Sequence, residues 1–123
     1  MEGALESQIH GALVDVMGVG VLLVGPSGIG KSECALELIR RGHRLVADDL
    51  VRLRQTEDGE RLVGTAPELI RHFIEIRGIG LLYVPDLYGE EAVLVEGEVA
   101  LLIRLEAWRN DAEYERVGLE RAV

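Results

Sequence analysis

Gly25-Pro26-Ser27-Gly28-Ile29-Gly30-Lys31-Ser32 is the most informative segment of this 123-residue sequence. It matches in full the pattern G-x-x-x-x-G-K-[ST], whose glycines let backbone N–H groups approach a phosphate closely. In such a loop Lys31 reaches the β- and γ-phosphates of a nucleotide, and the Ser32 hydroxyl binds Mg²⁺. The pattern therefore predicts a phosphate-binding loop (P-loop) that holds ATP through all eight residues, Gly25, Pro26, Ser27, Gly28, Ile29, Gly30, Lys31 and Ser32.

The segments on either side of the loop fit this interpretation. Residues 19–24 are almost wholly apolar, as expected of a strand buried on both faces, and residues 9–16 predict its hairpin partner, with a turn at residues 17–18. After the loop, apolar residues at helical spacing predict a helix over residues 31–41 that Gly42 ends. A chance glycine-rich turn is the alternative, but a strand before the loop and a helix after it favour a phosphate-binding loop.

The rest of the chain predicts a sheet with further strands. Residues 44–47 predict an apolar strand, which we expect residues 50–53 to continue, and residues 57–60 predict a turn between two strands. Pro67 is well placed to begin a short helix, and residues 99–105 predict another buried strand. Because a hairpin precedes the loop and a helix follows it, we expect an α/β fold with helices packed on a mixed sheet.

Composition narrows the class of protein. A chain of this length forms one domain and buries roughly two-thirds of its unfolded surface. Cys34 is the only cysteine, so an intrachain disulfide and a cysteine-rich metal site are excluded, and no apolar run approaches the ~20 residues that cross a membrane. The net charge of −9, with no basic stripe, argues against nucleic acid as a partner. These features predict a cytoplasmic protein that binds neither membrane nor nucleic acid.

Two neighbouring aspartates follow the strand after the loop and its helix. Asp48 and Asp49 stand where ligands bind in α/β proteins, and a carboxylate there accepts a hydroxyl proton or holds a metal ion. Since adjacent strand residues point to opposite faces, we expect one carboxylate to face the phosphates and the other to face away. The spacing does not choose between them, and a solvated strand end is an equal alternative.

Three further positions carry weaker signals. In residues 75–80, Glu75 and Arg77 stand beside two glycines, which predicts either a functional loop or a surface turn with a weak ion pair. The composition around His10 favours an ordinary strand residue over a catalytic group. Arg116 reads as a surface arginine.

Taken together, these segments resemble one family, HPr kinase/phosphorylase. The segments that carry the resemblance are Ile9-His10-Gly11, residues 18–22, residues 32–38, residues 41–49, residues 75–80, Leu105-Glu106 and residues 115–118. The resemblance implies a bifunctional bacterial enzyme that uses ATP and Mg²⁺ to phosphorylate a serine of HPr, the small carrier protein of the sugar phosphotransferase system. It also implies the reverse reaction, a phosphorolysis that releases pyrophosphate, a core similar to phosphoenolpyruvate carboxykinase, and a hexamer.

The resemblance also assigns roles by matching position. Asp49 becomes the general base in phosphorylation and the acid in the reverse reaction, and Lys31 holds the phosphates. Ser32 and Glu75 become ligands of Mg²⁺. His10 and Arg116 match positions that are catalytic in the family, although local chemistry gives no role for either. Residues 74–83 match a region needed for both directions.

The sequence departs from the family pattern at both ends. We expect residues 1–8 to be a disordered or added leader outside the family, and residues 9–123 to be a core without the family's N-terminal domain and C-terminal tail. On that expectation phosphorolysis suffers more than phosphorylation. Two alternatives follow, a module that binds nucleotide or phosphate without turnover, and a P-loop enzyme that acts on a small molecule.

Overall fold

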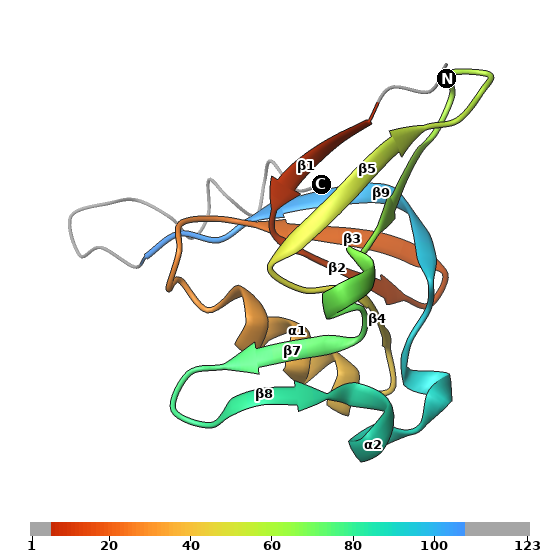
Figure 1. Cartoon of the computed structure of the whole chain (residues 1–123). Coiled ribbons are helices and arrows are strands. Elements are labelled where there is room, and N and C mark those ends of the chain that lie inside the picture. The colour runs from red at the N-terminus through yellow and green to blue at the C-terminus, as the bar shows by residue number, and fades with distance from the viewer. Residues whose placement is uncertain (1–5, 108–123) are drawn as a thin grey trace.

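The structure is a computed structural model, and it describes residues 6–107. Seven strands form one curled sheet in the order β1-β5-β6-β9-β3-β2-β4, and two more form a separate hairpin, β7-β8 (Figure 1). The strands are β1 Glu6–His10, β2 Ala12–Val16, β3 Val19–Val24, β4 Arg44–Ala47, β5 Leu50–Gln55, β6 Leu62–Thr65, β7 Phe73–Ile76, β8 Gly80–Tyr83 and β9 Glu96–Arg104. The helices are α1 Lys31–Arg40, η1 Glu68–Ile70, α2 Val84–Tyr88 and η2 Glu90–Ala92.

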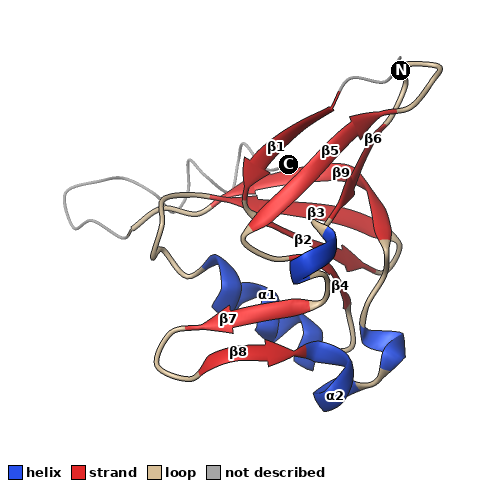
Figure 2. Cartoon of the chain, in the orientation of Figure 1, coloured by secondary structure: helices blue, strands red, loops and turns tan. Residues whose placement is uncertain are grey.

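The sheet is mixed, as the sequence predicts. Its one parallel pair joins β3 to β9, and its other neighbours are antiparallel. Among the described residues, α1 and the β7–β8 hairpin lie together on one side of the sheet, while β1, β5 and β6 curl over its other side (Figure 2). The expectation of helices on a central sheet is therefore met by one long helix, with a hairpin beside it.

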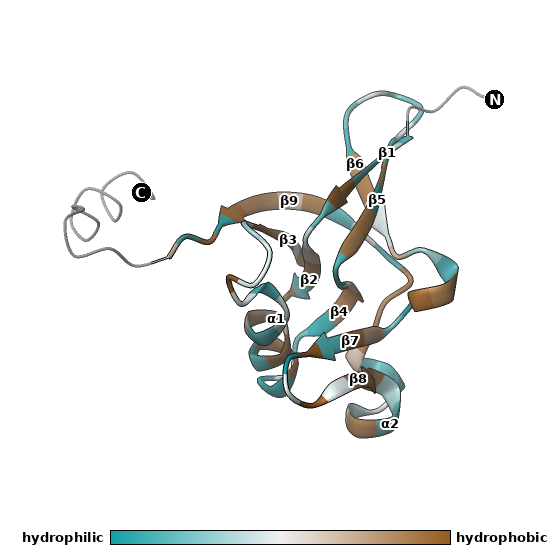
Figure 3. Ribbon diagram, turned by 60° about the vertical axis from the view of Figure 1, so that its left-hand side comes forward, coloured by the Kyte–Doolittle hydropathy of each residue, from teal (hydrophilic) through white to brown (hydrophobic). Residues whose placement is uncertain are grey.

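Two apolar clusters show why β3 is buried on both faces. Val21 and Leu23 pack into a cluster with Ala35 and Ile39 of α1, whereas Leu22 and Val24 belong to a second cluster inside the curl of the sheet. Alternate residues of a strand point to opposite faces, so an unbroken apolar run suits a strand that has a core on each side. Figure 3 shows the hydrophobic colouring of the central strands.

The predicted hairpin is correct, but its first strand is two strands. The turn between β2 and β3 is closed by the Gly18 N–H, which donates to Asp15 Oδ1 at 2.8 Å. Residues 9–16 do not form one strand, because the chain breaks at Gly11 and β1 pairs with β5 while β2 pairs with β3 and β4. A Cβ at Gly11 would lie 2.6 Å from the Leu23 carbonyl oxygen, so this crossing requires glycine.

The start of β1 contradicts part of the prediction that residues 1–8 form a disordered or added leader. Residues 6–8 pair with Arg54, Leu53 and Arg52 of β5, so they belong to the sheet and not to a disordered segment. Residues 1–5 lie outside the described residues.

Strand β5 is separate from β4, which corrects the expected continuation. Asp49 has φ of 74°, in the left-handed region, and this reversal turns the chain out of the line of β4. Strand β4 then pairs with β2, whereas β5 pairs with β1 and β6. The helix predicted from Pro67 is short because Arg71, directly after Ile70, is already extended, with φ of −60° and ψ of 126°.

Strand β9 exists where the sequence predicts it, but it is not buried. Leu101 and Leu102 are 50% and 53% exposed. Strand β6 pairs only with residues 96–98, so the later part of β9 has β3 on one side and no strand on the other among the described residues. Successive side chains of a strand point to its two faces, so an apolar run indicates burial only where other elements pack on both faces.

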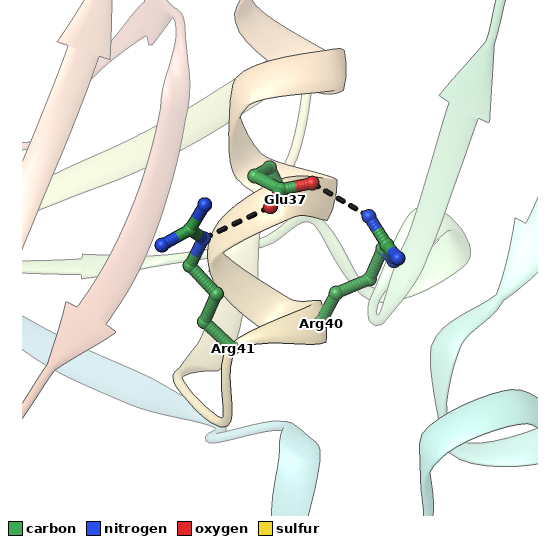
Figure 4. A network of polar contacts seen from close by, with 3 residues as sticks. All are labelled: Glu37, Arg40 and Arg41. Carbon is green, nitrogen blue, oxygen red and sulfur yellow. Dashed lines mark hydrogen bonds and ion pairs between the residues drawn. The ribbon is translucent and has the colours of Figure 1, made fainter.

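Helix α1 ends where the sequence predicts, and its last turn carries two exposed ion pairs. Glu37 accepts hydrogen bonds from Arg41 Nε at 2.9 Å and Arg40 Nη1 at 2.8 Å (Figure 4). The hydrogen bond from Arg41 and, to a smaller extent, the one from Arg40 lower the pKa of Glu37 below its ordinary value. Neither α1 nor any other described helix has the length and hydropathy to cross a membrane.

Candidate functional site

A cavity of about 520 Å³ lies where the glycine-rich loop, residues 25–32, meets the ends of β1, β4 and β7. The residues that line it are His10, Gly25, Ser27, Gly28, Gly30, Lys31, Ser32, Glu33, Asp48, Asp49, Glu75 and Arg77. Six loop residues and the three predicted acidic residues thus share one cavity. Pro26 and Ile29 complete the loop without lining the cavity.

The loop is folded around its own lysine. Lys31 Nζ donates hydrogen bonds to the carbonyl oxygens of Gly25 at 2.8 Å and Pro26 at 3.0 Å. Gly28 and Gly30 have φ of 83° and 108°, a left-handed conformation that glycine adopts without strain. Gly30 is also the N-cap of α1, so the first turn of that helix, with its partial positive charge, faces the cavity.

Asp48 is buried, and both oxygens of its carboxylate accept hydrogen bonds. It is 4% exposed, the Ser32 hydroxyl donates to its Oδ1 at 2.8 Å and Oδ2 at 3.0 Å, and the Glu75 N–H donates to Oδ2 at 3.2 Å. Burial raises the pKa of Asp48 above its ordinary value, the bonds from Ser32 and Glu75 oppose that change, and the charge of Asp49 adds to it. The Asp48 carboxylate therefore links α1, through Ser32, to β7, through the Glu75 N–H.

Asp49 is exposed, and its carboxylate has no hydrogen-bond partner among residues 6–107. Its backbone carbonyl accepts a bond from the Gly11 N–H at 3.2 Å, which ties it to the end of β1. The expectation that one aspartate faces away is wrong, because both line the cavity. Strand alternation does not apply to them, since β4 ends at Ala47 and Asp49 has a left-handed φ.

Glu75 of β7 and Arg77, the residue that follows β7, both line the cavity. The alternate residues Ile74 and Ile76 point the other way and are buried in the core, with exposures of 0% and 6%. Arg77 Nη2 donates to the Gly28 carbonyl oxygen at 2.8 Å and so joins this segment to the loop. The ion pair between Glu75 and Arg77 that a surface turn would show is absent from the described residues.

Of the two remaining predicted residues, His10 and Arg116, only His10 lies among the described residues. His10 is the last residue of β1, is exposed and lines the cavity. Arg116 lies outside the described residues. Sequence reasoning missed Glu33, in the first turn of α1, and the bond from Arg77 to the loop. The helix prediction places Glu33 one turn from Gly30, but no local pattern signals the Arg77 contact.

The oxygen atoms around the floor of the cavity suit a hard divalent cation. Ser32 supplies a hydroxyl, and Asp48 and Glu75 supply carboxylates. Within residues 6–107 no three His, Cys, Asp or Glu side chains are grouped to hold a metal ion by themselves. One hydroxyl and one or two carboxylates, together with phosphate oxygens and water, are ligands that Mg²⁺ commonly takes.

Comparison with known proteins gives consistent matches. The family described as "HPr Serine kinase C-terminal domain" matches residues 2–123, so residues 2–8, which we expected to lie outside the family, fall within it. The HPr kinase/phosphorylase of Caldanaerobacter subterraneus subsp. tengcongensis is 61% identical over 112 residues, covering 91% of this chain and 36% of that protein. The HPr kinase/phosphorylase of Lachnoclostridium phytofermentans is 56% identical over 120 residues, covering 98% of this chain and 38% of that protein.

A solved structure agrees. The HPr(Ser) kinase/phosphatase from Coxiella burnetii superposes with a TM-score of 0.79 at 38% identity, covering 89% of this chain and 65% of that one. The chain thus spans less than two-fifths of the two curated relatives. The family match, which takes in nearly every residue, and the shared mixed fold lead to one assignment: the chain belongs to the HPr serine kinase C-terminal domain family, whose named relatives are protein kinase/phosphorylases.

Proposed function

We propose that this chain carries the catalytic site of a protein-serine kinase and phosphorylase that transfers phosphate between ATP and a serine of HPr. The observation that supports the proposal best is the shared cavity, in which the loop with Lys31 faces Asp49, an exposed carboxylate without a partner among the described residues. Phosphoryl transfer needs a cradle for phosphates and an acceptor for the hydroxyl proton, and these two elements supply them.

In the forward direction, the loop and Lys31 would hold the phosphates of ATP in the cavity. The serine hydroxyl attacks the γ-phosphorus, the bond from the γ-phosphorus to the bridging oxygen of ADP breaks, and Asp49 accepts the serine proton. Asp49 suits this role better than Asp48 because Asp48 already accepts bonds from Ser32 and the Glu75 N–H. The choice between the two aspartates, which the sequence leaves open, thus rests on their accessibility.

In the reverse direction, inorganic phosphate would occupy the loop and attack the phosphorus of phosphoserine. The bond from that phosphorus to the serine oxygen breaks, pyrophosphate forms, and protonated Asp49 returns the proton to the serine. One residue then acts as base in one direction and acid in the other, as microscopic reversibility requires.

The cofactor of this reaction would be Mg²⁺, held by Ser32 and Glu75. When bound, it neutralises charge that develops on the phosphate oxygens. Asp48 would orient the Ser32 hydroxyl, to which it is bonded at 2.8 Å. His10 stands at the mouth of the cavity, where it would contact the substrate, and we propose a catalytic role for it and for Arg116.

The proposal extends to the setting of the enzyme. We propose that it works in the bacterial cytoplasm, where HPr and ATP are available, and that it assembles as a homo-oligomer, a hexamer as the family resemblance implies. Light scattering of the purified chain with and without ATP measures its mass in solution; a monomer under both conditions would contradict the hexamer for this chain.

The decisive experiment incubates the chain with γ-labelled ATP, Mg²⁺ and HPr, and locates the label. We expect label on a serine of HPr, and pyrophosphate release when serine-phosphorylated HPr and phosphate replace ATP and HPr. The matched control is Asp49→Asn, which should bind nucleotide in calorimetry without transferring label. Nucleotide binding by the parent chain without any transfer would contradict the enzyme and favour the nucleotide-binding module instead, while label on a metabolite would favour a small-molecule kinase.

A further inference from the structure

A second hollow, of about 400 Å³, lies at the opposite end of β7 from the cavity. It is lined by Glu68, Arg71, His72, Phe73 and Tyr83, none of which lines the first cavity. Glu68 belongs to η1, Arg71 and His72 lie between η1 and β7, and the other two residues are the first of β7 and the last of β8 (Figure 1). The hollow is therefore a distinct site on the hairpin, and the proposed phosphoryl transfer makes no use of it.

The arginine in this hollow is unsatisfied. Arg71 Nε is buried without a hydrogen-bond partner, and its guanidinium forms no hydrogen bond or ion pair with any described residue. Glu68, three residues earlier, is exposed and does not pair with it. Buried polar groups are almost always bonded, because leaving one unpaired costs about 1–3 kcal/mol. Because Nε itself is buried, an incoming acceptor would pair with the terminal nitrogens of the guanidinium, which form no hydrogen bond with any described residue.

The rings of Phe73, Tyr83 and His72 form the other walls of the hollow, and a hydrogen bond fixes the position of the His72 ring. The rings of Phe73 and Tyr83 are in tilted contact, with centroids 4.9 Å apart and planes inclined at 46°, and Tyr83 remains 36% exposed. His72 Nε2 lies 3.1 Å from the Leu94 carbonyl oxygen, and because a carbonyl only accepts, this nitrogen must donate. The bond holds the His72 ring in place beside Arg71.

We propose that this hollow binds a small molecule with an oxoanion, a phosphate ester or a carboxylate, next to a flat apolar group. The oxoanion would pair with the Arg71 guanidinium, whose planar donors match carboxylate and phosphate oxygens in a bidentate manner. The flat group would lie against the exposed part of the Tyr83 ring. Glu68, the one acidic side chain in the lining, opposes the anion and so limits its affinity.

Phenyl phosphate is the probe that tests both halves of the site. The titration uses the Lys31→Ala chain, so that the glycine-rich loop contributes little to phosphate binding. We expect saturable binding in calorimetry and a matching shift of the Arg71 Nε–H signal in the nitrogen–proton NMR spectrum. Adding Arg71→Gln should weaken the affinity about 10- to 100-fold, which is the loss of a charge-assisted bidentate bond.

Two further variants make the result specific. Glu68→Gln removes the opposing charge and should tighten binding about two- to fivefold, and Arg52→Gln, an exposed arginine on β5, should leave binding unchanged. NMR amide spectra confirm that each variant is folded. Equal affinity with and without Arg71, or no saturable binding in the Lys31→Ala chain, would overturn the proposal. Inorganic phosphate that binds as tightly as phenyl phosphate would overturn the role of Tyr83.

Discussion

The two walls of the cavity are built in opposite ways. One wall is the glycine-rich loop, whose eight residues are contiguous and whose shape is held by the bonds of Lys31 to Gly25 and Pro26. The other is an acidic wall of Asp48, Asp49 and Glu75, which come from two separate segments. A sequence pattern describes the first wall completely, whereas only the folded sheet assembles the second.

On the proposed function, this difference separates the residues that bind phosphate from those that carry out its transfer. Binding of a phosphate depends on a local backbone conformation, which glycines and one lysine encode. Proton transfer and metal binding depend on carboxylates that must stand at set distances from that backbone. Substitutions in the loop wall should therefore act mainly on nucleotide affinity, and substitutions in the acidic wall should act mainly on turnover.

The largest effect is expected for Asp49→Asn. The amide has nearly the same shape and tolerates the φ of 74°, but it does not accept the serine proton, so phosphate transfer to HPr should fall about 10²–10⁴-fold. Initial rates with labelled ATP measure transfer, and calorimetry should find nucleotide affinity within about threefold of the parent. A larger loss of transfer in Asp48→Asn would reverse the assignment of the two aspartates.

Lys31→Ala should break the loop wall instead. Removing the charged side chain deletes a charge-assisted bond to the phosphates, so the affinity for ATP should fall about 10- to 100-fold. Calorimetry measures the loss, and the free energy of unfolding in urea should fall by only about 1 kcal/mol, because the substitution removes the two bonds to Gly25 and Pro26 and no side chain of the core. Unchanged ATP affinity would contradict the phosphate-binding role of the loop.

Asp48→Asn should change the pH dependence of folding. The folded state raises the pKa of Asp48, so between its ordinary value of 3.8 and the raised value the folded chain binds more protons than the unfolded chain. Stability contributed by this group is present below pH 3.8 and lost as pH rises through the raised pKa. The parent should therefore lose stability relative to Asp48→Asn across this window in urea denaturation.

The matched variant for this test is Ser32→Ala. The Ser32 hydroxyl stabilises the charged carboxylate, so its removal should raise the pKa of Asp48 further and extend the loss to higher pH. Parallel pH profiles for the parent and Asp48→Asn would show that burial of this carboxylate has no energetic consequence.

The smallest effect is expected for Arg77→Gln, which removes the bond between the residue after β7 and the glycine-rich loop. Arg77 holds the Gly28 carbonyl oxygen at 2.8 Å at an exposed position, so its loss should lower nucleotide affinity only about two- to fivefold. Arg40→Gln, which breaks an exposed ion pair on the far end of α1, is the control. A loss equal to that of Lys31→Ala would mean that Arg77 itself binds phosphate.

The same contrast explains what the sequence could predict. The loop, β3 and α1 were predicted closely, because glycines, apolar runs and helical spacing are local signals. The continuation of β4 into residues 50–53 was wrong, since the left-handed turn at Asp49 is a tertiary outcome. The bond from Ser32 to Asp48 spans sixteen positions, so no local pattern contains it. The burial expected for β9 was wrong because the elements that pack on the faces of a strand, and not its own residues, decide its exposure.

The backbone at Asp49 carries a conformational cost that the role proposed for its carboxylate would explain. A left-handed φ of 74° carries about 1–3 kcal/mol of strain in a residue other than glycine. Glycine at this position would relieve that strain and would remove the carboxylate with it. Optimisation of this chain for thermal stability alone would thus favour the loss of its proposed base, and screens for robust variants need an activity readout to avoid selecting a sturdier but inert protein.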